Sequence, residues 1–187
     1  MKELLERHLL QHLGPATEVY RHDAQGAPLA IEVRRYADRP RPRAVTYLTF
    51  GLHQEVLPVK HGRMTRQELV FSHWDHNLGL DGPALLHGVA LELRRRGQAL
   101  LQGQALMQAT WPGYRVDALY VTPPPYFPES FDLCAATVPP TMLVGLVPID
   151  AGERDFLGQH GWSRFEDLWA ERNPNLLDLG RPSTISS

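Results

Sequence analysis

The chain has 187 residues, of which 43 % are hydrophobic and 21 % are charged, and its formal net charge at pH 7 is −2. This length is sufficient to bury one hydrophobic core, so we expect a single domain over residues 1–187, with its core at about 2–180 and a frayed polar tail at 181–187. A nearly neutral chain does not attract a phosphate backbone, and we therefore expect no nucleic-acid partner.

Cysteine usage and hydropathy favour a soluble, cytoplasmic protein. Cys134 is the only cysteine, so an intrachain disulfide cannot form and a site of four thiolates is excluded. The first ten residues carry charges every few positions and do not resemble a secretory signal. The longest apolar run, at 142–147, is much shorter than the roughly 20 residues of a membrane-spanning helix. We therefore expect no membrane partner.

The first predicted element is an amphipathic helix over about residues 4–13. Its leucines recur on one side, and Gly14 with Pro15 ends it. His8 and His12 lie within the apolar stripe at the four-residue spacing of zinc-binding helices. Because no third ligand is identifiable, we interpret both as packed or boundary histidines.

Two strands are predicted next, at 31–36 and 44–50, because both segments are rich in β-branched and aromatic residues. The second has apolar side chains on both faces and should lie centrally in a sheet. A polar loop follows and leads to a third strand at 66–74. Loops between rigid strands commonly carry binding residues. We therefore predict protein-partner contacts at His53, Glu55, His61 and Arg63.

The third strand ends in His-Trp-Asp-His, residues 73–76, a pattern that could indicate a metal or acid–base site. In an extended strand His73 and Asp75 share one face, and Trp74 and His76 share the other. The two imidazoles therefore need a bend before they can bind one ion, and a catalytic zinc ion needs a third protein ligand. We favour an ordinary strand end and keep as an alternative a metal-dependent hydrolase that uses His73, His76 and a third ligand.

The clearest helix begins after Asp81, where a proline suits the first turn, and ends at Gly97. The arginines at 94–96 complement the negative end of its helix dipole and do not require a nucleic-acid role. A strand at 118–122 enters a proline cluster. We expect the aromatic side chains of that cluster to dock back on the domain rather than to bind a partner.

A continuous apolar run at 141–149 predicts a strand buried on both faces. Two capping-box patterns follow, Asp150 with Glu153 and Ser163 with Glu166, and they predict helices that begin directly after Asp150 and Ser163. The predicted architecture is therefore α+β, with a mixed, largely antiparallel β-sheet packed with helices.

Motifs for catalysis or cofactor binding are missing from the sequence. Neither GxxxxGK nor GxGxxG occurs, and no GxSxG nucleophile elbow is present. Cys134 lies among small apolar residues, where a buried inert thiol is the common case. We expect no catalytic residue, no bound metal and no cofactor.

Six short motifs follow one another along the chain. They are TYLTFGL at 46–52, RQELVF at 66–71, LYVTPP at 119–124, LVGLVPIDAGE at 143–153, GWSRFEDLW at 161–169 and LLDLGRPS at 176–183. In this order they resemble the motifs of the suppressor of fused (SUFU) domain family.

The resemblance implies a non-enzymatic protein-binding domain. The animal member of the family holds a zinc-finger transcription factor by strand addition, and many bacterial relatives are proposed immunity proteins that bind and block a toxin domain. Compared with the animal protein, we expect this chain to be without the second, carboxy-terminal lobe that completes the peptide cleft. The resemblance therefore implies a bacterial single-domain member and favours an immunity protein of a toxin–antitoxin system over a regulatory clamp on a transcription factor peptide.

Overall fold

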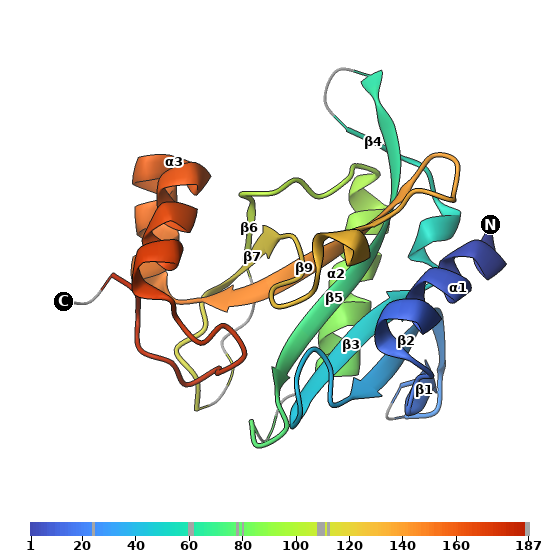
Figure 1. Cartoon of the computed structure of the whole chain (residues 1–187), viewed down its shortest axis with the longest axis horizontal. Coiled ribbons are helices and arrows are strands. Elements are labelled where there is room, and N and C mark those ends of the chain that lie inside the picture. The colour runs from blue at the N-terminus through green and yellow to red at the C-terminus, as the bar shows by residue number, and fades with distance from the viewer. Residues whose placement is uncertain are drawn as a thin grey trace.

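The structure, a computed structural model, describes residues 1–23, 25–59, 62–77, 79, 81–107, 111 and 113–185. Within these residues nine strands form one mixed sheet with three α-helices against it (Figure 1). The strands are β1 (Glu18–His22), β2 (Pro28–Ala37), β3 (Ala44–Phe50), β4 (Leu57–Pro58), β5 (Met64–Trp74), β6 (Ala105–Met107), β7 (Ala118–Thr122), β8 (Leu133–Cys134) and β9 (Thr141–Ile149). The α-helices are α1 (Lys2–Leu13), α2 (Gly82–Arg96) and α3 (Ala151–Arg172), and short 3-10 helices lie at η1 (Leu52–Gln54) and η3 (Glu129–Phe131). None of the described helices is long and apolar enough to cross a membrane.

The order of strands across the sheet is β1-β2-β3-β5-β9-β7-β6, with β4 beside β5 and β8 beside β9. Every pairing between the described strands is antiparallel except that of β5 with β9. This arrangement confirms the predicted α+β fold with a mixed, largely antiparallel sheet. Strand β3 lies between β2 and β5, and all seven of its residues are buried, as its two apolar faces predict.

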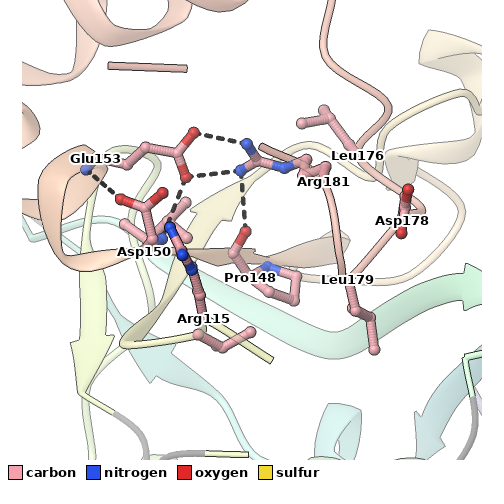
Figure 2. A pocket seen from close by; sticks show the side chains of 10 residues that line it. Arg115, Pro148, Asp150, Glu153, Leu176, Asp178, Leu179 and Arg181 are labelled. Carbon is pink, nitrogen blue, oxygen red and sulfur yellow. Dashed lines mark hydrogen bonds and ion pairs between the residues drawn. The ribbon is translucent and has the colours of Figure 1, made fainter. Parts of the chain in front are cut away.

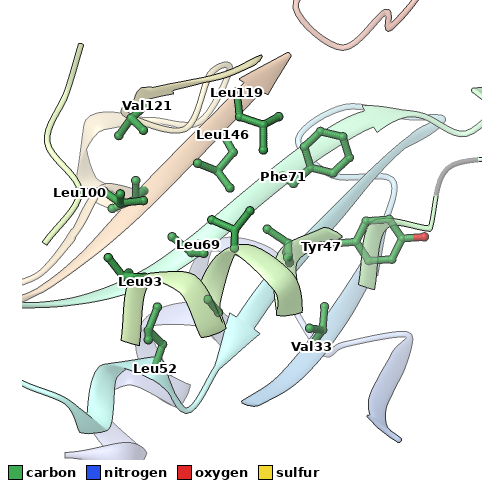
Figure 3. Close-up of a cluster of buried hydrophobic side chains, with 14 of the residues drawn as sticks. Val33, Tyr47, Leu52, Leu69, Phe71, Leu93, Leu100, Leu119, Val121 and Leu146 are labelled. Atoms are coloured by element: carbon green, nitrogen blue, oxygen red, sulfur yellow. The ribbon is translucent and has the colours of Figure 1, made fainter. Parts of the chain in front are cut away.

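Helix α2 covers one face of the sheet, while α1 and α3 cover the other. Neighbouring residues of a strand point to opposite faces. On β7, Leu119 belongs to the cluster under α2, whereas Tyr120 packs with residues of α3. On β3, Tyr47 likewise lies under α2 and Leu48 lies under α1. Figure 3 shows the cluster under α2, where Leu93 of the helix meets side chains of the sheet.

The sheet divides where β5 and β9 separate (Figure 1). The two strands pair over residues 66–70 and 141–145, and the remainder of β9 pairs with β7. The segment after α3 bonds to the freed edge of β5, because the carbonyl oxygen of Leu177 accepts a hydrogen bond from the backbone N–H of Trp74 (3.0 Å). Leu179, two residues further on, is buried in the cluster under α2. Residues 177–179 are therefore part of the packed structure.

The prediction of a frayed tail at 181–187 is wrong for its first residues. The side chains of Arg181 and Thr184 both bond to the carboxylate of Glu153, and Thr184 is buried. A buried carboxylate needs hydrogen-bond donors, and the tail supplies them. Residues 186 and 187 lie outside the described residues.

The two helices predicted after β9 run on as α3, with one non-helical residue, Gly161 (φ 81°), between them. Asp150 and Glu153 form the predicted capping box, with bonds of 2.9 and 3.2 Å. In the second predicted capping box, Ser163 with Glu166, the glutamate turns toward the sheet instead. Its carboxylate accepts a hydrogen bond from the hydroxyl of Tyr120 (2.8 Å). The need of the buried Tyr120 hydroxyl for an acceptor outweighs local capping at this position.

Candidate functional site

A buried carboxylate, Glu68 of β5, joins the first two sequence motifs. Its side chain is 0 % exposed and accepts hydrogen bonds from the hydroxyl of Thr49 (2.5 Å) and the backbone N–H of Gly51 (2.8 Å). The backbone N–H and ring Nδ1 of His53 also bond to it, at 3.0 and 2.5 Å. We call these four residues the Glu68 hub. The hub satisfies the charge of Glu68 and fastens η1 to the end of β3.

An arginine of the same strand holds the other end of η1. The Nη1 of Arg66 donates to the carbonyl oxygens of His53 (2.7 Å) and Gln54 (3.0 Å). Thr49 has a second bond, since its hydroxyl accepts from the backbone N–H of Leu69 (2.8 Å) in place of a carbonyl oxygen of the ladder. Glu68 thus accepts from a backbone N–H of η1, and Arg66 donates to two of its carbonyl oxygens. These two β5 side chains of opposite charge fix η1 to the sheet.

His53 does not lie on an exposed loop as the sequence analysis expected. Its side chain is 0 % exposed, because Glu68 draws the imidazole into the interior and the ring packs beside Phe50 at 5.1 Å. His53 therefore anchors η1 from within and is not available to touch a partner. This corrects the predicted role of His53 in direct partner contact.

The other predicted contacts lie on the segment that follows η1, residues 55–64, which we call the β4–β5 hairpin. A backbone bond from Val59 N to Arg63 O (2.8 Å) closes it, and Arg63 is exposed. Glu55 is partly buried and forms an ion pair with Arg94 near the end of α2. His61 lies outside the described residues. The structure thus brings Glu55 and Arg63 onto one projecting hairpin (Figure 1).

Two apolar side chains accompany these charges on the β4–β5 hairpin. Val56 is 39 % exposed and Met64 is 47 % exposed. Methionine and arginine are enriched at protein interfaces, and an apolar side chain flanked by charges is common there. Neither residue is predicted from the sequence, because an isolated valine or methionine in a loop carries no distinct pattern.

A second buried carboxylate, Glu153 at the start of α3, binds the last motif (Figure 2). Arg181 donates to both of its oxygens at 2.7 Å, and the hydroxyl of Thr184 adds a bond of 2.5 Å. Arg181 also donates to the carbonyl oxygen of Pro148 at the end of β9 (3.2 Å). The cavity beside this cluster, about 20 Å³, has room for one water molecule. The bonds of Glu153 to Arg181 and Thr184 thus hold the segment after α3 against the start of that helix.

The residues of the His-Trp-Asp-His stretch lie in separate surroundings. His73 is buried next to Tyr47, its Nδ1 lies 2.7 Å from the carbonyl oxygen of Trp74, and burial lowers the pKa of its imidazole. His76 is exposed and stacks on Trp74, with 6.4 Å between ring centres. Nowhere in the described parts of the chain do three His, Cys, Asp or Glu side chains gather so that they could hold a metal ion. The stretch has the geometry of a strand end.

The proline cluster docks on the domain, as its aromatic residues predict. Phe127 packs on Phe131 with 4.4 Å between ring centres, and the Tyr126 hydroxyl bonds to backbone groups after α3. On the other side of Phe131, His8 Nε2 lies 2.9 Å from its carbonyl oxygen, and the ring of His12 is 4.7 Å from that of His8. The two histidines of α1 are therefore packed at a boundary, as expected.

Comparison with known proteins places these features in a family. The sequence pattern described as suppressor of fused protein (SUFU) matches residues 28–182, a range that includes Glu68, Glu153 and Arg181. A search of curated protein sequences finds no match.

Three solved structures have the same fold at 13 % identity. A SUFU homologue from Neisseria gonorrhoeae FA 1090 has a TM-score of 0.74, and the match covers 100 % of this chain and 97 % of that chain. A structure of the Sufu–Fu complex has a TM-score of 0.66, with 98 % and 90 % covered. Suppressor of Fused from Drosophila has a TM-score of 0.65, with 98 % of this chain but 50 % of that chain covered. Because the sequence pattern of the family matches most of its length, the chain belongs to the suppressor of fused family.

Proposed function

We propose that the chain is a single-domain, non-enzymatic protein-binding module of the cytoplasm, and that its partner is a toxin domain which it neutralises as an immunity protein. The observation that carries this proposal is the β4–β5 hairpin, which projects from a base made rigid by the Glu68 hub. A base that is fixed in advance reduces the entropy lost when the partner binds.

The polar residues of the family motifs support a binding role. Inside the domain, Glu68 and Arg66 bond to η1, and Glu153 bonds to Arg181. These polar groups therefore stabilise the fold. Groups available to a partner lie instead on the β4–β5 hairpin. We propose direct contacts by Glu55, His61 and Arg63, together with the exposed side chains of Val56 and Met64, and a positioning role for His53.

The solved structures give this proposal independent support. One of them contains the same fold in a complex, Sufu with Fu, so a domain of this architecture can engage another protein. The hairpin presents a projecting surface with both apolar area and charge. Such a surface suits contact with a folded domain, whereas small molecules bind in concave pockets.

Co-expression with the protein encoded beside this chain tests the proposal. If that neighbour ends in a toxin domain, the chain should restore growth of the cells and co-purify with the toxin. The double variant Arg63→Glu, Met64→Asp should weaken binding at least about tenfold, because both side chains are exposed on the proposed surface and the variant reverses one charge and adds another. The matched control is Arg164→Glu, the same arginine substitution on the exposed face of α3.

Two results would contradict the proposal. Binding that is equally tight for the wild type and the hairpin variant would remove the β4–β5 hairpin as the contact surface. Failure of the purified chain to bind the neighbouring toxin domain would remove the immunity role. Unchanged far-ultraviolet circular dichroism of the variant establishes that a lost interaction is not caused by unfolding.

A further inference from the structure

A hollow of about 550 Å³ lies between the β1–β2 hairpin and the first half of α2. Its lining includes Tyr20, Asp23, Leu29, Asp81, His87 and Gly88. We call it the α2 hollow. Its volume falls within the range of ligand-binding pockets, about 300–1,000 Å³.

The α2 hollow is separate from the β4–β5 hairpin. The hairpin meets the carboxyl end of α2, where Arg94 pairs with Glu55, whereas the hollow lies at the amino end of the helix (Figure 1). Because an α-helix rises about 1.5 Å per residue, Gly88 at one end of the hollow lies about 9 Å along the helix from Arg94, and Asp81 at the other end lies about 20 Å from it. The hollow and the hairpin are therefore formed by different residues and can be tested separately.

Two carboxylates line the hollow, and the backbone fixes both of them. One oxygen of Asp23 accepts bonds from the backbone N–H groups of Gln25 (2.9 Å) and Ala27 (2.8 Å) in the turn between β1 and β2. One oxygen of Asp81 accepts from the backbone N–H of Ala84 (2.9 Å) and caps α2. Among the described residues, no hydrogen bond uses the second oxygen of either carboxylate. Neither Asp23 nor Asp81 forms an ion pair with a described lysine or arginine, and none of the described lining residues is a lysine or arginine.

The rest of the lining suits the stem of a long side chain. The ring of Tyr20 and the side chain of Leu29 supply an apolar wall, and an aromatic ring can also contact a cation through its face. Gly88 leaves the helix surface open, since a Cβ at this position would meet nothing within 4 Å. The Nε2 of His87 is buried without a hydrogen-bond partner among the described residues, and burial lowers the pKa of this imidazole. The neutral ring therefore adds no positive charge that would repel a cation from the hollow.

From this arrangement we infer that the α2 hollow binds the cationic side chain of a lysine or arginine from another protein. The charged head lies between Asp23 and Asp81, and the methylene stem lies along Tyr20 and Leu29. Fixed carboxylates attract a guanidinium or ammonium group and repel phosphate. The ligand is thus a basic side chain and not a nucleotide.

Nuclear magnetic resonance titration with two capped amino acids tests the inference. N-acetyl-arginine amide carries the charge, and N-acetyl-citrulline amide has nearly the same shape without it. The arginine probe should shift backbone resonances of residues 20–29 and 81–88 and bind about tenfold more tightly than the citrulline probe, since two carboxylates face the charge. Asp23→Asn and Asp81→Asn should each weaken binding about fivefold.

Both substitutions keep the local fold, because asparagine is itself a good N-cap and turn residue. Asp167→Asn, on the exposed part of α3, is the matched control and should bind the arginine probe like the wild type. Equal binding of the two probes, shifts away from the hollow, or absence of binding at millimolar probe would overturn the inference. Tighter binding of free L-arginine than of the capped form would also overturn it, because the site would then recognise an amino acid and not a side chain. None of these outcomes bears on the hairpin, which is tested with separate variants.

Discussion

Replacing Glu68 with glutamine changes the charge of the Glu68 hub while it keeps the size of the side chain. Glu68 accepts four hydrogen bonds from buried groups of Thr49, Gly51 and His53. Hydrogen bonds to a charged group contribute about 1.5–3 kcal/mol each, and neutral ones contribute about 0.5–1.5 kcal/mol. In the variant one carboxylate oxygen becomes an NH₂ group, which cannot accept the hydroxyl proton of Thr49.

The expected loss of unfolding free energy is about 2–4 kcal/mol, since roughly 1 kcal/mol per bond is offset in part by the lower cost of burying a neutral side chain. Urea denaturation followed by circular dichroism and tryptophan fluorescence measures this loss, with the slope of the free energy against urea unchanged. Glu55→Gln is the control, because its single, partly exposed ion pair should cost less than about 1 kcal/mol. A loss below about 1 kcal/mol for Glu68→Gln would refute the argument that the hub stabilises the fold.

Three further predictions concern other parts of the fold. Gly82→Ala should cost about 1–3 kcal/mol by chemical denaturation, since the new Cβ would lie 2.4 Å from ring atoms of Tyr47, and an unchanged midpoint would contradict the packing. Arg181→Met should cost about 3–5 kcal/mol, because it leaves the buried carboxylate of Glu153 without its cation, and a stable variant would show that the chain end is not clamped. Burial raises the pKa of Asp132 from 3.8 to about 6, so the folded state binds a proton more tightly than the unfolded state does. Protonated Asp132 therefore favours the folded state at low pH, and this stabilisation is lost as pH rises from about 4 to 6. Asp132→Asn should therefore increase the melting temperature at pH 7 more than at pH 4, and an equal change at both values would contradict this.

The main elements follow from sequence periodicity because they are strongly apolar. The runs 44–50, 118–122 and 141–149 correspond to β3, β7 and β9, and the proline after Asp81 marks the start of α2. Strand β1 was not predicted, since its five residues are mostly exposed and polar and show no alternation. It forms because β2 offers an edge for pairing, which is a property of the assembled sheet.

The candidate site was harder to predict because its bonds join residues that are distant in sequence. The polar loop was recognised from 53 to 65, but the burial of His53 depends on Glu68, fifteen residues away. The signal for this contact was the position of Glu68 itself, a carboxylate inside the apolar run of β5 that must find donors when buried. The packing of Arg181 was likewise hidden in the sequence, because it stands in a polar segment and its partner Glu153 lies 28 residues before it.

Hydrogen exchange of the free chain and of its complex with the proposed toxin partner is the decisive measurement for the role of the hairpin. We predict that binding slows exchange of the described backbone amides of the β4–β5 hairpin, at residues 55–57, 59 and 62–64. The amides of Gly51 and His53 are already protected in the free chain by their bonds to Glu68. Protection that appears only elsewhere, with exchange in the hairpin unchanged, would contradict it.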